Sequence, residues 1–176
     1  MPPTATRTFR GALAGAVAAA VWAAQQPLDR LLFGVPYDDT ELLGRWFVPG
    51  PGWRPVGVAL HVANGAAFGA VYANVARSLP VPAAARGPLA GLAEHVGTWP
   101  ATAFLDRVHP AAGDLPQLWG SGRAFAQATW RHLLFGTVLG ELERRLNAAV
   151  GPPEVVDDAL AASNGHGSVE HVVAPL

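Results

Sequence analysis

Four apolar stretches, separated by polar connections, dominate the pattern of the chain. They cover about residues 9–28, 56–76, 88–105 and 124–142. The pattern shows no alternation typical of strands, so it predicts an all-α protein with four long helices. A helix that crosses a membrane needs roughly 17–25 mostly apolar residues. By hydropathy alone the second stretch meets this requirement, the first and third are marginal, and the fourth fails because charged residues interrupt it.

Small and polar residues inside these stretches recur as an internal repeat. About residues 9–76 form the first unit, and about residues 87–146 form the second. The corresponding positions are Gly11 and Gly87, Gly15 and Gly91, Asp29 and Asp106, His61 and His132, Gly65 and Gly136, and Gly69 and Gly140. Because each unit holds two stretches, the repeat predicts two tandem helical hairpins that bury their faces against each other. The fourth stretch, as the copy of the second, then also becomes a membrane helix.

These observations together predict an integral membrane four-helix bundle over residues 1–147. Two units with an even number of helices each would be parallel repeats about an axis along the membrane normal. The eight glycines of the repeat are spaced four residues apart within each helix. In lipid this spacing lets helix backbones approach closely, so we expect these glycines to form the packing faces of the helices.

The arginines indicate which ends of the helices face the cytoplasm. They gather before the first helix, between the second and third helices, and after the fourth, at Arg7, Arg10, Arg77, Arg86, Arg144 and Arg145. By the positive-inside rule, this predicts a multi-pass protein of a bacterial plasma membrane with both termini in the cytoplasm. The other two connections mix charges of both signs and hold tryptophans. Apolar side chains at helical spacing in residues 42–47 predict a short interfacial helix, and residues 118–119 occupy the matching place in the second unit.

The two ends of the chain carry interpretations of their own. Arg7 and Arg10, followed by small and apolar residues as far as Ala24, also resemble a signal peptide with a passable cleavage site at residues 21–23. Against this alternative, the first stretch repeats the third, which cannot be a signal peptide. Residues 148–176 are rich in Pro, Gly, Asp and Ser without periodicity, and predict a disordered cytoplasmic tail.

Composition narrows the classes of function. Hydrophobic residues make up 51% of the chain and charged residues only 14%, below the ~25% of an average soluble protein. This composition fits a protein whose main partner is the lipid bilayer. A net charge of −1 gives no basic face for nucleic acid, and the absence of cysteine excludes disulfides and thiolate metal sites. The serines fall in connections or in the tail, so we expect no serine nucleophile.

Ionisable and polar residues inside the apolar stretches are the candidate functional residues, because burying them in a membrane is costly. Counting the helical rise from the cytoplasmic ends places Glu94 ~12 Å deep and Arg131 ~15 Å deep. We therefore expect these two charges to pair between the third and fourth helices, with the neighbouring histidines beside them. The predicted buried polar cluster comprises Glu94, His95, Arg131, His132, His61 and Asn64. For any single member, a hydrogen bond that holds two helices together is the simpler interpretation.

A second candidate region lies at the outer ends of the helices. Pro27 and Pro100 interrupt the first and third stretches at related places, and paired interruptions can mark a binding site. The polar residues expected around the mouth of such a site are Gln26, Asp29, Arg30, Asp106, Arg107 and His109. The alternative is that each proline only ends its helix, with the Asp-Arg pairs at the membrane interface.

The histidines also raise the question of a metal or a cofactor. Glu94, His95 and His132 could supply three zinc ligands, but neighbouring residues on a helix diverge by ~100°, so we predict no metal site. His61 and His132 are equivalent in the repeat, so they could bind the two faces of one haem. The Gly-x3-Gly faces leave little room for a porphyrin, and haem stays a secondary alternative.

Three functions are compatible with these patterns. The leading hypothesis is an accessory or scaffolding subunit that packs through its small-residue helix faces against a second copy or a larger membrane complex. Its motivation is that the chain has more small-residue faces than four short helices need among themselves. The alternative is passage or sensing of a proton, an ion or a small solute through the polar interior. A haem-binding redox protein is the second alternative, and no pattern predicts catalytic residues.

Overall fold

The computed structural model describes residues 4–148, and all regular structure within them is helical. The α-helices are α1 (Thr4–Phe33), α2 (Asp39–Phe47), α3 (Trp53–Val75), α4 (Ala83–Thr98), α5 (Thr102–Val108) and α6 (Gly122–Ala148). Short 3-10 turns occupy Gly50–Gly52, Ala76–Ser78 and Trp99–Ala101. The predicted all-α class is confirmed. The tail predicted over residues 148–176 lies, except for Ala148, outside the described residues.

Local sequence explains where several of these helices begin and end. The carboxylate of Asp38 accepts hydrogen bonds from two backbone N–H groups at the start of α2, as an N-cap residue does. Gly34 ends α1 with a φ of 64°, a conformation that glycine adopts without strain. Pro100 does interrupt the third stretch, since the 3-10 turn that contains it separates α4 from α5. Pro27 does not end its helix, because α1 continues through it for six further residues.

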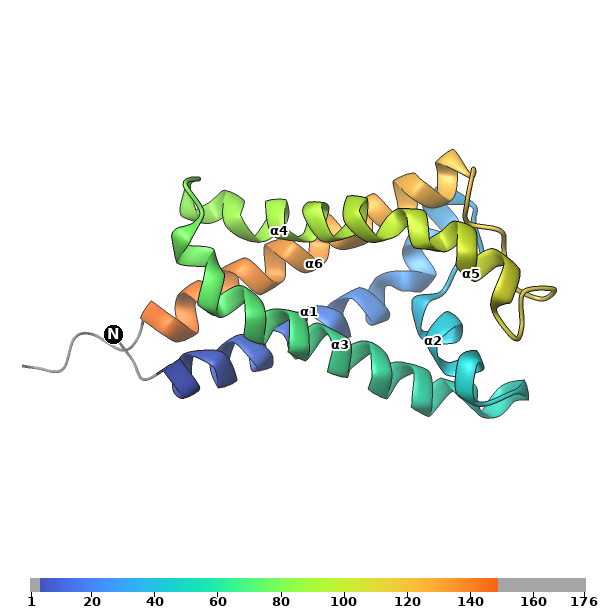
Figure 1. Ribbon diagram of the computed structural model, residues 1–176, viewed down its shortest axis with the longest axis horizontal. Helices are drawn as coiled ribbons and strands as arrows, with labels where there is room; N and C mark the ends of the chain where they lie inside the picture. Colours follow the sequence, from blue (N-terminus) through green and yellow to red (C-terminus); the bar gives the residue numbers. More distant parts are fainter. Residues whose placement is uncertain (1–3, 149–176) are drawn as a thin grey trace, which may run out of the picture.

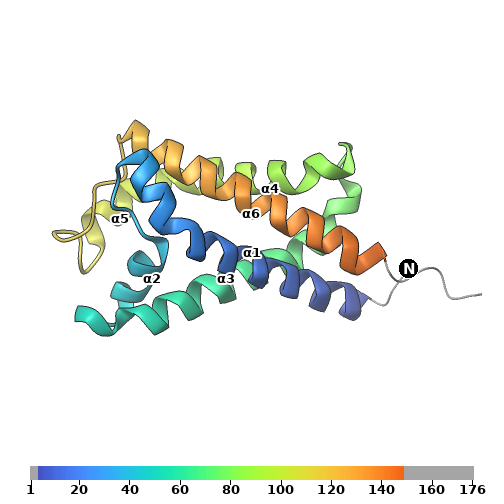
Figure 2. The same cartoon turned by 180° about the vertical axis from the view of Figure 1, so that it is seen from behind.

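The four long helices form two hairpins that run in the same direction along the molecule (Figure 1). The first hairpin packs α1 against α3, and the second packs α4 against α6. Contacts between α1 and α6 join the two hairpins, and α2 packs on α3 (Figures 1 and 2). The beginning of α1 and the end of α6 lie together, where Arg10 Nη1 donates to the Leu146 carbonyl at 2.9 Å. We call this end of the bundle the terminal end.

The glycines of the repeat lie at the helix crossings of both hairpins. A Cβ atom added to Gly15 would overlap the Gly65 carbonyl oxygen, and one added to Gly69 would overlap that of Gly11. In the second hairpin, a Cβ atom on Gly87 would overlap the Gly136 carbonyl oxygen. The remaining contacts of this kind place Gly91 against the His132 backbone and Gly140 against Gly87. These are the close approaches that the Gly-x3-Gly spacing predicts, and they lie within the chain.

The core is built mostly from small residues of α1 and larger ones of α3 and α6. It comprises Ala14, Ala18, Ala19, Trp22, Tyr72, Ala76, Phe135 and Leu139. Many large apolar side chains point outward instead, among them Leu31 with 82% and Phe9 with 71% of their surface exposed. Within the described residues, one helical segment, Gly50–Ser78, is long and apolar enough to cross a membrane by length and composition.

Candidate functional site

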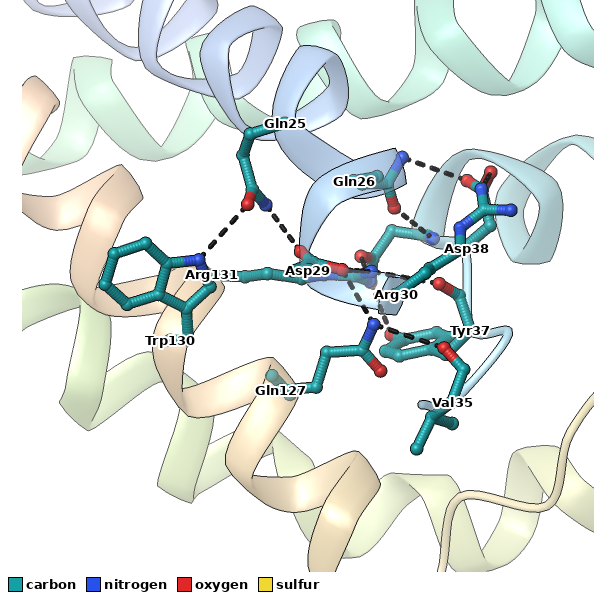
Figure 3. A network of polar contacts seen from close by, with 12 residues as sticks. Gln25, Gln26, Asp29, Arg30, Val35, Tyr37, Asp38, Gln127, Trp130 and Arg131 are labelled. Carbon is teal, nitrogen blue, oxygen red and sulfur yellow. Dashed lines mark hydrogen bonds and ion pairs between the residues drawn. The ribbon is translucent and has the colours of Figure 1, made fainter. Parts of the chain in front are cut away.

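Arg131 is the centre of a buried network that joins α1, α2 and α6 (Figure 3). Its side chain is fully buried, and its Nε and Nη2 atoms each donate to an oxygen of Asp29 at 2.6 Å. Its Nη1 atom donates to Asp39 Oδ2 at 2.6 Å, and Nη2 also reaches the Tyr37 carbonyl at 2.9 Å. The guanidinium thus faces two carboxylates, one of them in the strong bidentate arrangement. The expected pair between Glu94 and Arg131 is therefore wrong.

The physical reason is that height along a helix does not determine the direction of a side chain. Arg131 and His132 are adjacent on α6, so their side chains diverge by ~100°. Arg131 points to α1, where Asp29 lies, and His132 points to Glu94 on α4. Glu94 on α4 therefore meets the side of α6 that carries His132, and Arg131 points to a different side.

Amide and indole side chains complete the shell around Asp29. Gln127 Nε2 donates to Asp29 Oδ1 at 2.7 Å, and Gln25 Nε2 donates to Oδ2 at 2.6 Å. Trp130 in turn donates to Gln25 Oε1 at 3.1 Å. Asp29 and Gln127 are both fully buried. Asp29, Gln127 and Arg131 at the centre of the network are closed to any ligand, and we interpret the network as the clamp that holds the two hairpins together.

Asp39, Tyr37 and Gln127 are the members of this clamp that the sequence analysis missed. The Trp22 indole donates to Asp39 Oδ2 at 2.9 Å, and the Tyr37 hydroxyl donates to Asp39 Oδ1. Burial, and then the neighbouring Asp39 carboxylate, raise the pKa of the Tyr37 phenol well above its ordinary value, which keeps it a donor. The feature of the sequence that could have identified Asp39 is the pair of adjacent aspartates at residues 38–39. One aspartate can cap α2 while the side chain of the next points into the bundle.

Gln26 and Arg30 fix the connection between α1 and α2. Gln26 Nε2 donates to Asp38 Oδ1 at 3.1 Å, and Arg30 forms an ion pair with the same carboxylate. Burial opposes the ionisation of Asp38, but hydrogen bonds from Thr40 and from the Glu41 backbone outweigh it. Together with the charge of Arg30 they keep the pKa of this carboxyl below its ordinary value.

The other residues of the predicted outer mouth belong to the α5–α6 connection. The Asp106 carboxylate accepts from the backbone N–H groups of Leu118 at 3.0 Å and Trp119 at 2.7 Å. His109 Nδ1 accepts from the Ala111 N–H at 3.0 Å, so its Nε2 carries the hydrogen and donates to the Leu42 carbonyl at 2.9 Å. Arg107 lies with Asp106 and His109 along a shallow pocket.

The six outer residues therefore do not surround one opening. Gln26 and Arg30 line a different shallow pocket from the one lined by Asp106, Arg107 and His109, and Asp29 is enclosed in the clamp. The prediction of a shared mouth fails because α1 continues past Pro27, so the two interruptions do not produce matching ends.

A second polar cluster lies on the other side of α6, between α6 and α4. His132 Nε2 lies 2.6 Å from Glu94 Oε2, and His132 Nδ1 lies 2.7 Å from the Ala128 carbonyl. Since a carbonyl can only accept, Nδ1 carries a hydrogen. The short contact between His132 Nε2 and Glu94 Oε2 then needs a second proton between these two atoms. Either His132 carries it, as an imidazolium beside a carboxylate, or Glu94 carries it, as a carboxylic acid beside a neutral imidazole. We call these two side chains the proton-sharing pair.

His95 packs against this pair but does not join it. Its ring centroid lies 4.7 Å from that of His132, and only 1% of the residue is exposed. His95 Nε2 lies 3.0 Å from Thr129 Oγ1, whose own hydrogen is donated to the Phe125 carbonyl at 2.8 Å. His95 Nε2 is therefore the donor. This histidine orients the pair and holds α4 to α6.

His61 presents an unpaired polar atom in the same region. The residue is 7% exposed, and its Nε2 atom is buried with no hydrogen-bond partner among the described residues. Its ring packs edge-on against Trp22, with centroids 5.2 Å apart. Asn64, expected in the buried cluster, is exposed instead, because it lies on the open side of α3 at the edge of the cavity described next.

A cavity of about 230 Å³ brings these groups together. His61, Asn64, Glu94, His95 and His132 all line it. It continues into an apolar groove of about 570 Å³ between α3 and α4, and Phe68 and Glu94 line both. The groove exists because α3 and α4 diverge from their connection instead of packing along their length (Figure 1). We call the cavity and the groove together the α3–α4 site.

The arrangement of the histidines bears on the metal and haem alternatives, which stay predictions. Within residues 4–148 no group of three histidine or acidic side chains is placed to hold a metal ion. The Trp22 ring packs against both His61 and His132, with centroids 5.2 and 4.6 Å away.

A scan of protein-family models found no match to this chain, and searches of curated proteins and of solved structures found none either. Its function therefore has to be inferred from the geometry of these residues.

Proposed function

We propose that this protein is a membrane four-helix bundle that binds a small amphipathic molecule in the α3–α4 site. The observation that carries this proposal is the buried, unpartnered His61 Nε2 in a cavity that also holds Glu94 and His132 and opens into an apolar groove. A buried polar atom without a partner costs about 1–3 kcal/mol. A ligand that hydrogen-bonds at the polar end and lays its apolar part along the groove would remove this cost. Ligand sites are mostly apolar clefts with a few such polar groups.

The distribution of side chains supports a membrane location for the bundle. Exposed apolar residues surround the long helices, among them Phe9, Leu13, Val17, Leu28, Val71, Leu89, Val96 and Trp130. Arginines meet at the terminal end, where Arg77, Arg86 and Arg144 line one small pocket. The connections at the other end hold Trp46 and Trp119, residues typical of a membrane interface. With the positive-inside rule, this distribution supports the proposal that both ends of the bundle's chain face the cytoplasm.

We expect topology reporters to follow this orientation. An alkaline phosphatase fused after Arg54 should be active and a green fluorescent protein fused there should be dark, since this position would lie outside. The fusions after Leu146 should behave in the opposite way. A cytoplasmic position for Arg54, or a mature chain that begins near Ala24, would exclude the four-helix topology.

The glycine contacts weaken the reason for favouring a scaffolding subunit. That hypothesis depended on small-residue faces beyond what the chain needs internally. The crossings of α1 with α3 and of α4 with α6 use all eight glycines of the repeat within the chain. No small-residue face of the repeat is left over for another subunit.

The interior of the bundle also fits the binding or sensing of a small molecule better than the passage of a proton, an ion or a solute through the bundle. On α6, His132 and Glu143 are separated by ~16 Å of helical rise, and Phe135 and Leu139 are buried between them. Ala14, Ala18 and Tyr72 pack against this segment and close the interior. The polar groups of the cavity therefore do not continue to the terminal end.

A photolabelling experiment tests the α3–α4 site. Dodecanol with a diazirine in its chain and a terminal alkyne would be irradiated with the protein in phosphatidylcholine nanodiscs. We expect saturable labelling of the groove residues of α3 and α4, mapped by mass spectrometry. Ala93→Trp should reduce this labelling about tenfold or more, because Ala93 lines the groove and an indole would fill it.

The matched control is Ala126→Trp, which places the same side chain on the exposed face of α6. This variant should label like the wild type. Labelling that does not saturate and spreads evenly over all helices would show that the probe reports only the bilayer, and would exclude the proposed site.

A further inference from the structure

We infer that the molecule bound in the α3–α4 site is a lipophilic amine, held as its ammonium ion beside Glu94 with its hydrocarbon part in the groove. This inference rests on the proposed function and specifies its ligand. It is carried by the charges and rings that line the cavity, and by how the proton-sharing pair is connected.

The charges that line the cavity favour a cation over an anion. Asp39 and Glu94 both line it, and among the described residues no arginine does. Arg131 lies behind two residues that line the cavity, Asp39 and Tyr37, and its fully buried guanidinium is already paired with Asp29 and Asp39. It therefore cannot act as a counter-ion for a ligand. A carboxylate or phosphate at the polar end would face Glu94 with no positive partner except His132.

Aromatic rings form a substantial part of the apolar wall of the cavity. Trp22, Tyr37, Phe68, Trp99 and Phe135 all line it. Aromatic rings attract ammonium groups through their negative faces, most strongly where water is excluded. An aliphatic wall would accept the hydrocarbon part equally well but would give no such preference. The aromatic rings therefore strengthen the preference for a cation that the carboxylates already create.

The hydrogen-bonding groups match a protonated amine. Glu94 is about one-third exposed, and the structure gives its second oxygen, Oε1, no partner within residues 4–148. His61 Nε2 is buried and also lacks a partner. A neutral imidazole nitrogen can accept a hydrogen bond, and so can a carboxylate oxygen. An ammonium group supplies the donors that both atoms lack.

Binding of the ammonium should release one proton from the proton-sharing pair. Before binding, Glu94 and His132 hold one proton between them in addition to the hydrogen on His132 Nδ1. After binding, Glu94 is a carboxylate paired with the ammonium, and His132 keeps only its Nδ1 hydrogen. One ammonium ion enters and one proton leaves, so the charge of the site is conserved. The other titratable groups that line the cavity are His61 from α3, His95 from α4, and Asp39 and Tyr37.

Competition against the photoreactive dodecanol tests the inference in phosphatidylcholine nanodiscs. Dodecylamine should compete at about tenfold lower concentration than dodecanol, and dodecanoate should be the weakest of the three. Glu94→Gln should remove the advantage of the amine while dodecanol still competes, which shows that the groove is intact. Glu141→Gln is the matched control, since Glu141 lies at the terminal end and pairs with Arg144. The Glu141→Gln variant should keep the advantage of dodecylamine over dodecanol in the competition.

Because partition into the bilayer differs among the three compounds, the decisive quantity is the amine-to-alcohol ratio in the wild type against that in Glu94→Gln. Equal ratios in the two proteins would overturn the inference while leaving an amphipathic site in place. Absence of competition by all three compounds would instead overturn the proposed function, and the inference with it.

A second measurement needs no variant. With dodecylamine, which stays an ammonium ion below about pH 9, proton release predicts that apparent affinity rises by up to about tenfold per pH unit. The rise should occur where the free pair still holds its proton, because only there does binding release one, and it should level off at higher pH. An affinity that is independent of pH between pH 5 and about pH 9 would contradict the exchange of an ammonium ion for a proton.

Discussion

Replacing Arg131 by methionine is expected to lower the free energy of unfolding by about 3–5 kcal/mol. The change leaves the buried Asp29 carboxylate without its bidentate partner and Asp39 without its cation. A buried charge that loses its partner has no water to replace it, so the cost exceeds that of any surface pair. Unfolding by sodium dodecyl sulfate, followed by circular dichroism in mixed micelles, would measure the difference.

The matched control is Arg144→Met, which removes an arginine from an exposed ion pair on the same helix. It should change stability little, because solvent screens such a pair. The double variant Arg131→Met, Asp29→Leu should recover part of the lost stability. It removes the fully buried carboxylate and leaves without a cation only Asp39, which is partly exposed and still accepts from Trp22 and Tyr37. A single variant no less stable than Arg144→Met would show that the clamp does not hold the hairpins together.

The helices themselves could be predicted because their information is local. The apolar stretches predicted the four long helices, and the apolar side chains of residues 42–47 predicted α2. The glycine spacing predicted the crossings, since only glycine permits backbones to approach so closely. Each of these conclusions depends on residues within one or two turns of a single helix, or on a repeat that is visible by inspection.

The pairing of the buried charges could not be predicted in the same way. Glu94, Arg131 and His132 were recognised as candidates, but the choice of partner depends on which side of α6 each neighbouring helix occupies. Asp39 was counted as a charge in a connection, because nothing in the local sequence shows that α2 folds back over the end of the bundle. The clamp therefore depends on tertiary arrangement rather than on a motif.

The groove between α3 and α4 is also a property of the arrangement. A bundle in which all neighbouring helices pack would bury His61, Phe68 and Glu94 against one another and leave no site. Here the contacts of α1 with α6 join the hairpins, and α3 and α4 separate as they leave their connection. Hydropathy is the same for both arrangements, so the sequence pattern alone does not distinguish a filled interior from an open one.

The crossing of α1 and α3 should be as sensitive as the clamp to the addition of one methyl group. Gly15→Ala is expected to destabilise the protein by about 3 kcal/mol, at the upper end for overpacking. The added Cβ atom would overlap the Gly65 carbonyl oxygen, which is backbone and cannot rotate away. The two helices would have to separate, and the contacts of the whole first hairpin would weaken. The same detergent titration would measure the loss.

Gly97→Ala provides the matched control for this prediction, because it is the same chemical change within α4. A Cβ atom at position 97 would meet nothing within 4 Å. Alanine is favoured over glycine inside a helix by about 0.5–1 kcal/mol, so this variant should be slightly more stable than the wild type. The two substitutions are therefore expected to have opposite signs. If both stabilise the protein, helix propensity governs position 15, and α1 and α3 do not cross at the distance that the structure shows.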